Sequence, residues 1–97
     1  MSDIAVRHNP DASRFESDTP DGLALAQYRR ARGGVAFTHT EVPESQEGQG
    51  IGEALAEAAL DWAKAEGLPV YPYCPFIAAF IERHDRYASL VAADFSA

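Results

Sequence analysis

Alternating apolar and polar residues dominate the N-terminal half of the chain, and this period of two is typical of β-strands. Four such segments are predicted, at residues 4–8, 14–17, 23–30 and 35–42. Turn-forming residues separate them, namely Asn-Pro-Asp at 9–11, Thr-Pro-Asp-Gly at 19–22 and the glycine pair at 33–34. Because proline and glycine favour tight turns, these sequential segments predict an antiparallel meander of four strands.

The apolar period changes to that of an α-helix from residue 51 onwards. Apolar residues then recur at spacings of four and three along one predicted face: Ile51, Leu55, Ala58, Trp62 and Ala65. Acidic residues lie on the other face, and Glu53 is in the first turn, where a negative charge complements the helix dipole. Gly67 and Pro69 are typical of residues that end a helix, so the helix is predicted to end before them.

The last third of the chain predicts a short strand and a second helix. Residues 68–73 form the strand, and its two prolines confine it to an edge or a splayed position. Pro75 suits the first position of a helix, and residues 85–93 predict a further helical turn or two. A helix between the fourth and fifth strands favours a right-handed crossover with those strands parallel. The chain is therefore predicted to be one α+β domain over residues 1–97, with an antiparallel four-strand meander, a helix crossover, a splayed fifth strand and a C-terminal helix.

Composition and net charge limit which partners the protein can bind and in which cellular compartment we expect it. Fifteen acidic residues against eight Lys and Arg give a net charge of −7, which argues against nucleic acid and mildly favours a cationic partner such as an amine. An acidic balance also simply keeps a small protein soluble. The single cysteine excludes an internal disulfide and fits a reducing compartment, and the histidines lack the spacing of metal ligands. No apolar run reaches the ~18 residues that span a membrane, and residues 1–3 do not begin a secretory signal. We therefore expect a cytoplasmic protein. We also expect that it binds no metal and is a monomer or weak dimer.

A glycine-rich run at residues 47–52 (Glu-Gly-Gln-Gly-Ile-Gly) joins the fourth strand to the first helix. Glycines here let the backbone approach a ligand, and free N–H groups at the helix start can bind phosphate oxygens. A Walker loop ends in Gly-Lys-Ser/Thr, whereas this run ends in Ile-Gly-Glu. A Rossmann fingerprint has another glycine spacing and lies early in a βαβ unit. The acyl-CoA loop of the GCN5-related N-acetyltransferases, Arg/Gln-x-x-Gly-x-Gly/Ala, is matched by Gly50 and Gly52.

Three motifs in order extend this match, and with them the chain resembles the small single-domain acetyltransferase-like proteins of the YjdJ type. They are His-Thr-Glu-Val-Pro at 39–43, Gly-Gln-Gly-Ile-Gly at 48–52, and Cys-Pro-Phe at 74–76 followed by Arg-His at 83–84. Together with Tyr28 and Arg29, the resemblance extends over residues 4–91. Two positions depart from the family pattern, since Glu47 stands where arginine usually precedes the loop glycine and Asp85 stands where proline usually follows the histidine.

The resemblance implies acetyl transfer from acetyl-CoA to an unknown amine acceptor. It implies that acetyl-CoA is bound by the strand end and the loop, at Val42, Glu47, Gly48, Gln49, Gly50, Ile51 and Gly52. Larger family members insert helices after the first strand, whereas that link here is only residues 9–12, so an open acceptor side is expected that suits a protein or peptide amine. Two alternatives stay open, a non-catalytic CoA or acyl-CoA binding module and an interaction domain on the same scaffold, and Glu47 favours both.

Three side chains are candidates for the chemistry. His39 and Glu41 are two residues apart, so both are expected to face the same side of their strand as Val35 and Phe37, and either can act as a general base. The alternatives are a histidine that is hydrogen-bonded for structure and a solvated acid. Cys74 is expected at the N-cap of the second helix, where a thiol ionises more readily. It can protonate the leaving thiolate or accept the acetyl group as a nucleophile, or it is a buried small apolar residue.

Overall fold

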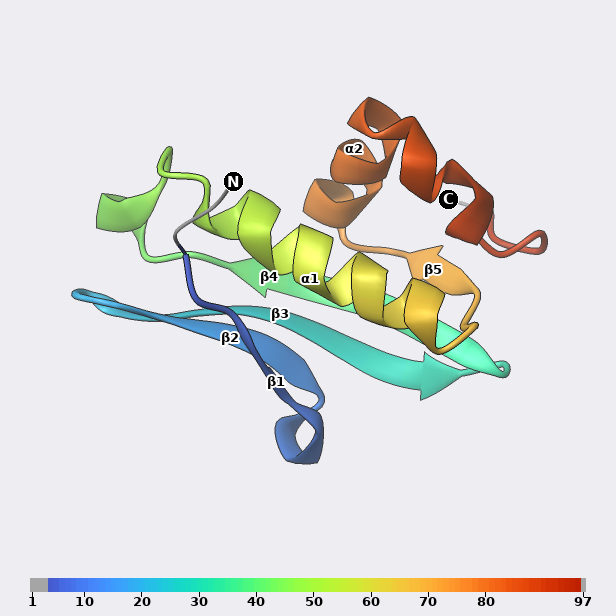
Figure 1. The fold of residues 1–97 in the computed structure, drawn as a ribbon, viewed down its shortest axis with the longest axis horizontal. Coiled ribbons are helices and arrows are strands. Elements are labelled where there is room, and N and C mark those ends of the chain that lie inside the picture. Colours follow the sequence, from blue (N-terminus) through green and yellow to red (C-terminus); the bar gives the residue numbers. More distant parts are fainter. Residues whose placement is uncertain (1–3, 97) are drawn as a thin grey trace.

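The computed structural model describes residues 4–96, and the strands form one five-stranded sheet (Figure 1). The strands follow one another across the sheet in sequence order: β1 (Arg7–Asn9), β2 (Arg14–Thr19), β3 (Gly22–Ala31), β4 (Gly34–Glu41) and β5 (Val70–Pro72). The first four strands are antiparallel and β5 is parallel to β4, so the predicted meander and crossover are confirmed. Met1–Asp3, on which the expected absence of a secretory signal rests, and Ala97 lie outside the described residues.

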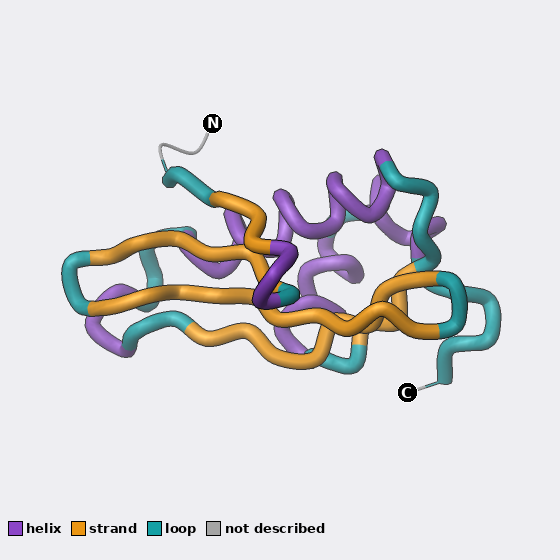
Figure 2. Tube along the Cα trace, turned by 90° about the horizontal axis from the view of Figure 1, so that it is seen from below, coloured by secondary structure: helices purple, strands orange, loops and turns teal. Residues whose placement is uncertain are grey.

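Both α-helices cover the same face of the sheet (Figure 1). The helical elements are α1 (Ile51–Ala65) and α2 (Pro75–Arg83), with short 3₁₀ turns η1 (Pro10–Ala12), η2 (Glu44–Gln46) and η3 (Asp85–Leu90). Seen from below, the strands lie in front of α1 and α2, so neither helix covers the lower face of the sheet (Figure 2). In the described part of the chain, the helices lack the length and apolar character needed to cross a membrane.

The buried side of α1 differs from the predicted stripe. Leu55, Leu60 and Ala63 are fully buried, whereas Ala65, which was predicted on the buried face, is exposed. Ala56 and Leu60, outside the predicted stripe, are buried as well, because α2 and η3 also contact α1 and its buried surface extends around a second side of the helix. Tyr87 of η3 is fully buried there, and its hydroxyl donates a hydrogen bond of 2.7 Å to the carboxylate of Asp61.

The first strand is shorter than predicted, because residues 4–6 leave the sheet. The ladder between β1 and β2 begins at Arg7, which pairs with Glu16. Before this point, the hydroxyl of Ser17 donates a 2.9 Å hydrogen bond to the carbonyl of Ala5, so a side chain replaces the backbone partner that a continued strand would use. The predicted start at residue 4 was therefore wrong by three residues.

A β-bulge interrupts the pairing of β3 with β4. Phe37 pairs with Tyr28 and His39 pairs with the adjacent Gln27, so Thr38 has no partner on β3. An extra residue in one strand reverses the alternation of side chains beyond it. Side chains after Thr38 therefore face the side opposite to the one that simple alternation predicts.

The bulge corrects the prediction that His39 and Glu41 face the same side as Val35 and Phe37. Val35 and Phe37 are fully buried in the core with α1, whereas His39 and Glu41 are exposed. His39 and Glu41 lie on the lower face of the sheet, opposite α1, which we call the open face. Thr40 takes their place on the side of α1, because the bulge shifts the alternation by one residue.

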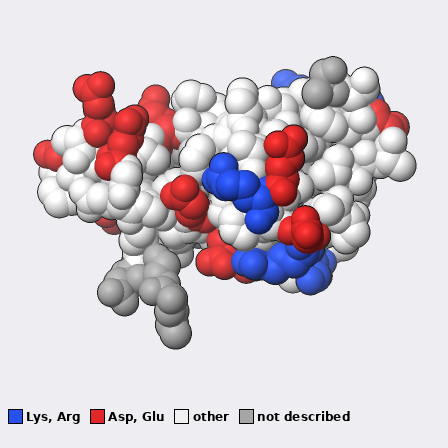
Figure 3. Space-filling view, turned by 90° about the horizontal axis from the view of Figure 1, so that it is seen from above, with Lys and Arg blue, Asp and Glu red and all other residues white. Residues whose placement is uncertain are grey.

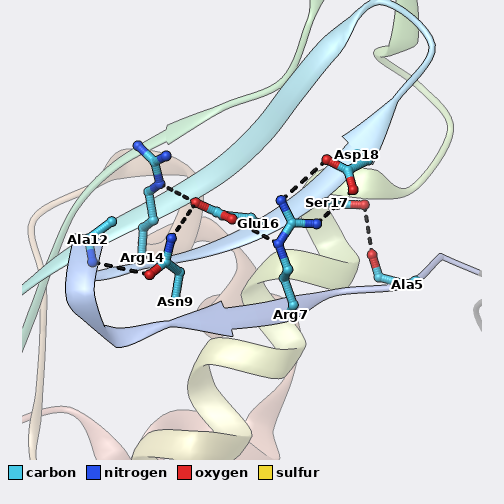
Figure 4. Close-up of polar contacts among 8 residues, drawn as sticks. All are labelled: Ala5, Arg7, Asn9, Ala12, Arg14, Glu16, Ser17 and Asp18. Carbon is cyan, nitrogen blue, oxygen red and sulfur yellow. Dashed lines mark hydrogen bonds and ion pairs between the residues drawn. The ribbon is translucent and has the colours of Figure 1, made fainter.

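A nearly buried acid, Glu16, joins β1 to β2. Its carboxylate accepts hydrogen bonds from Arg7 Nε at 2.9 Å, from Asn9 Nδ2 at 3.0 Å and from Arg14 Nε (Figure 4). Arg7 also donates a 2.7 Å hydrogen bond to Asp18. The hydrogen bonds from Arg14 and Asn9 hold the pKa of Glu16 below its ordinary value. Hydrogen-bonded partners on both strands thus offset the burial of this carboxylate.

We expect Glu16→Gln to lower the melting temperature at neutral pH and to lose this effect in acid. Because the pKa of Glu16 is lower in the folded than in the unfolded state, its ionised form stabilises the fold above the ordinary value of 4.5. This stabilisation is lost as the pH falls through the lowered pKa of the folded state, so the wild type approaches the variant. Thermal unfolding of both proteins between roughly pH 7 and pH 3 measures the difference. Glu66→Gln, at an exposed position, is the control, and a gap that stays constant with pH contradicts the prediction.

Candidate functional site

The loop before α1 has the backbone geometry of an anion-binding turn. Gly48 and Gly50 have φ angles of +83° and +84°, in the left-handed region that favours glycine. Gly50 is the N-cap of α1 and has no side chain to bond the first helical N–H groups. The first intrahelical bond of α1 runs from the N–H of Ala54 to the carbonyl of Gly50, so the N–H groups of residues 51–53 have no partner within the helix. These donors are available to an anionic ligand.

Gly52 is required for a different reason, which is close packing between the two helices. A Cβ atom placed on Gly52 would lie 2.7 Å from Cζ of the Phe76 ring on α2. The phenyl ring therefore lies directly against the first turn of α1. The loop glycines thus have two functions, since Gly48 and Gly50 set the backbone path and Gly52 lets α2 approach α1.

A pocket of about 580 Å³ opens between this loop, the end of β4 and the start of α2. Its lining includes six of the seven residues predicted to bind acetyl-CoA: Val42, Glu47, Gly48, Gly50, Ile51 and Gly52. Gln49 instead lines the neighbouring hollows on the other side of the loop. Four lining residues were not predicted from the sequence: Thr40, Gln46, Glu53 and Phe76. Its volume is within the range of sites that bind small molecules, roughly 300–1,000 Å³.

β4 and β5 separate next to Thr40 and Phe76, which line this pocket. Their ladder ends where Phe37 pairs with Pro72, and one more hydrogen bond of 2.9 Å joins the N–H of Cys74 to the carbonyl of Phe37. Beyond this point β4 continues to Glu41, whereas the other chain segment turns into α2 at Pro75. The edge of β4 after Phe37 thus has no β5 neighbour, which is the splay that the prolines of the fifth strand predicted.

Cys74 lies at this separation point and is the N-cap of α2, as predicted. Its side chain is nearly buried, with 4% of its surface exposed. The sulfur lies 3.3 Å from the hydroxyl oxygen of Thr40, close enough for a hydrogen bond. Sequence reasoning missed Thr40, because it reaches this place only through the bulge in β4.

His39 and Glu41 lie together on the open face and not on the side of Cys74. His39 Nε2 and Glu41 Oε2 are 3.6 Å apart, which is an ion pair when the imidazole is protonated. Both side chains are more than half exposed. The structure therefore divides the three predicted catalytic residues between the two faces of the sheet. Among residues 4–96, no group of three or more His, Cys, Asp and Glu side chains is placed to hold a metal ion.

Comparison with known proteins agrees with the geometry of the loop and the splay. A family model described as GCN5-related N-acetyl-transferase matches residues 14–90. The chain belongs to this family. The matched segment runs from the start of β2 to the end of η3, so it includes the bulge, the glycine loop and Cys74. The resemblance to GCN5-related N-acetyltransferases is therefore confirmed.

Relatives of this family member include vertebrate and bacterial proteins. Protein NATD1 from Bos taurus is 40% identical over 50 residues, which is 52% of this chain and 44% of that protein. Protein NATD1 from Xenopus tropicalis is 29% identical over 86 residues, which cover 86% of this chain and 79% of that protein. The solution structure of a GCN5-like protein from Staphylococcus aureus superposes with a TM-score of 0.71 at 25% identity, covering 95% of this chain and 91% of that one. The chain thus spans less than half the length of the bovine relative.

Acidic side chains surround the glycine loop of this family member. Figure 3 shows them gathered at the end of the molecule where this loop lies, with the basic side chains of that view further along. Glu44, Glu47 and Glu53 are exposed there, and two of them, Glu47 and Glu53, line the pocket. At ~5 Å and an effective dielectric near 20, one carboxylate repels one phosphate charge by roughly 3 kcal/mol before screening by water and salt. The backbone donors of the loop do not depend on these side chains.

Contacts with the β2–β3 turn hold the segment before the loop in place. The carboxylate of Asp21 accepts a hydrogen bond of 2.9 Å from Gln46 Nε2 and another from the hydroxyl of Ser45. The hydrogen bond from Ser45, and to a lesser extent that from Gln46, holds the pKa of Asp21 below its ordinary value. Gln46 lines the pocket, so the hairpin fixes one of its walls.

Proposed function

We propose that this protein is an acetyl-CoA-dependent N-acetyltransferase that acts on an amine acceptor. The observation that supports this most directly is one pocket that is lined by the glycine loop and also by Thr40, whose hydroxyl contacts the sulfur of Cys74. Membership of the GCN5-related family supports the same reaction class. Acetyl-CoA supplies an activated acetyl group as a thioester, and the protein binds and orients it.

The residues of the pocket fit the parts of such a ligand. The N–H groups at the start of α1 and the left-handed glycines Gly48 and Gly50 form a cradle for the pyrophosphate, as in other helix N-terminal phosphate sites. Val42 directly follows β4, where backbone groups without a β5 partner can pair with the pantetheine amides. Phe76 supplies an apolar wall. The thioester is thereby directed towards the splay.

The reaction forms a bond between the amine nitrogen and the acetyl carbon and breaks the bond from that carbon to sulfur. The thiolate that leaves must then gain a proton. Cys74 can give this proton directly, or its sulfur can first displace CoA and the amine then attacks the resulting cysteine thioester. His39 and Glu41 can remove the proton of the amine from the open face. A free thiol at Cys74 fits a reducing cytoplasmic environment.

The acceptor approaches, in this proposal, from the open face of the sheet. The link between β1 and β2 is only the short turn η1 (Pro10–Ala12), and neither α-helix covers this face (Figure 2). His39 and Glu41 are exposed on it. Such a surface suits a protein or peptide amine better than an enclosed metabolite. Glu47 favours a second candidate function, a module that binds CoA or acyl-CoA without turnover.

Binding of acetyl-CoA tests the proposal first. We expect saturating acetyl-CoA to raise the melting temperature by roughly 10 °C or more, since a ligand at ~100 times its Kd stabilises by about 2.7 kcal/mol and 1 kcal/mol shifts a domain of this size by about 4–8 °C. Differential scanning fluorimetry measures this shift, with adenosine monophosphate as the control ligand. No shift with millimolar acetyl-CoA would exclude both the transferase and the CoA-binding module.

A pair of charge reversals shows whether the ligand uses the predicted pocket. Glu47→Arg should tighten acetyl-CoA binding by about tenfold, because it replaces part of the carboxylate–phosphate repulsion by attraction. Glu44→Arg makes the same charge change at an exposed position that does not line the pocket, and it is the matched control. Equal effects of both variants, measured by isothermal titration calorimetry, would mean that only the overall charge matters.

A further inference from the structure

We propose that Thr40 is a positioning residue for Cys74, whose hydroxyl donates a hydrogen bond to the sulfur and stabilises its thiolate form. This inference rests on the proposed function, because it concerns the thiol that the transfer reaction would use. Thr40 belongs to neither the predicted cofactor-binding residues nor the predicted catalytic residues. Its role follows from the contact of 3.3 Å between its hydroxyl oxygen and the sulfur.

The bulge in β4 brings this hydroxyl to the thiol. Simple alternation from Phe37 would place His39 on the side of α1 and Thr40 on the open face. Because Thr38 is an extra residue, Thr40 instead pairs with Ala26 of the buried core and turns towards the splay. A bulge that redirects one side chain is frequent beside active sites.

Because Cys74 is buried, a thiolate at its sulfur needs a hydrogen-bond donor from the protein. Only 4% of the surface of Cys74 is exposed, so water cannot fully solvate a thiolate there. A thiolate has no proton and can only accept hydrogen bonds, so the hydroxyl of Thr40 must then be the donor. A hydrogen bond made to the charged form of a group favours that form.

Thr40 also connects the sulfur with the ligand side of the site. Thr40 lines the pocket between the glycine loop and α2, whereas Cys74 lies inside the core cluster next to it. Thr40 thus contacts the sulfur and also lines the pocket proposed for the thioester. The same hydroxyl can hold the sulfur in place whether Cys74 acts as acid or as nucleophile.

Alkylation of Cys74 tests this inference without acetyl-CoA. Cys74 is the only cysteine in the sequence, so the rate of reaction with iodoacetamide as a function of pH reports its ionisation alone. We expect Thr40→Val, which keeps the shape and removes the hydroxyl, to raise the pH midpoint by roughly one unit, because a hydrogen bond to a charged group is worth about a factor of ten. Thr40→Ser, which restores a hydroxyl, should return the midpoint towards that of the wild type.

Thr38→Val is the matched control, since Thr38 is the neighbouring threonine of the same strand and its hydroxyl contacts the carbonyl of Gln27 instead. A midpoint in Thr40→Val equal to that of the wild type, or an equal shift in Thr38→Val, overturns the inference. Circular dichroism checks that the variants fold, and Thr40→Ala replaces the valine variant if that one does not. A shifted midpoint in a protein that fails to bind acetyl-CoA would support the Thr40 contact and contradict the proposed function, so the two failures are distinguishable.

Discussion

Cys74→Ala is expected to reduce the release of CoA from acetyl-CoA in the presence of a lysine-containing peptide by roughly 10²–10⁴-fold, the usual contribution of a positioned acid or base. Cys74 lies where β4 and β5 separate, and its sulfur contacts Thr40, which lines the pocket. Cys74 is the N-cap of α2, so its thiol lies at the start of this helix and can protonate the leaving thiolate. The rate of thiol release measures the effect.

Intact mass after incubation with acetyl-CoA separates the two roles of Cys74. A single added acetyl group in the wild type that is missing from Cys74→Ala indicates a nucleophile, whereas lost turnover without an adduct indicates a general acid. Cys74→Ser is the conservative variant, and the thermal shift with acetyl-CoA shows whether each variant keeps the pocket. Unchanged turnover in Cys74→Ala would move the chemistry to His39 and Glu41 on the open face.

Gly34→Ala is expected to destabilise the fold by about 3 kcal/mol or more, at the upper end of overpacking effects. A Cβ atom on Gly34 would lie 2.2 Å from the carbonyl oxygen of Pro69, which is backbone and cannot turn away like a side chain. The same oxygen accepts a 2.9 Å hydrogen bond from the N–H of Val35, so its displacement also weakens the joint between β4 and β5. A domain of this size has only about 5–15 kcal/mol of stability in total.

Gly33→Ala is the matched control for this prediction. Gly33 has a φ of +75°, and a Cβ atom placed on it would meet nothing within 4 Å. Alanine at this position therefore causes backbone strain of about 1–2 kcal/mol and no collision. Urea unfolding of both variants compares the free energies of unfolding. A loss in Gly33→Ala equal to or larger than that in Gly34→Ala would mean that the turn conformation, and not the contact with Pro69, limits this part of the hairpin.

Helix α1, the turn between β3 and β4 and the start of α2 could be predicted from the residues within each segment. The bounds of α1 agree with the predicted helix from residue 51 to residue 65, because its apolar period and its terminating Gly67 depend on nearby residues alone. A tight turn joins β3 to β4 as predicted, but its two residues are Arg32 and Gly33, both with positive φ, and Gly34 is already the first residue of β4. Cys74 is the N-cap of α2 because Pro75 begins that helix.

The sequence predicted the loop residues that line the candidate site, but it did not predict Thr40 of β4. The glycine pattern lies within one short segment, so the sequence alone could point to Gly48 and Gly50, and both line the pocket. The bulge at Thr38 is not a local signal, because it exists only relative to the register of β3. Because of the bulge, His39 lies on the open face and Thr40 contacts Cys74. The side of the sheet that was predicted for His39 and Glu41 was therefore wrong.

By itself, the sequence determined the order of the elements, the left-handed glycine turns of the loop and the family. These depend on periodicity, on glycine at positive φ and on motifs, all of which are properties of short segments. Only the tertiary structure decided which side chains meet across elements, such as Thr40 with Cys74, Gly52 with Phe76 and Glu16 with Arg7. The physical reason is that such contacts follow from strand register and helix packing, which join residues far apart in the chain.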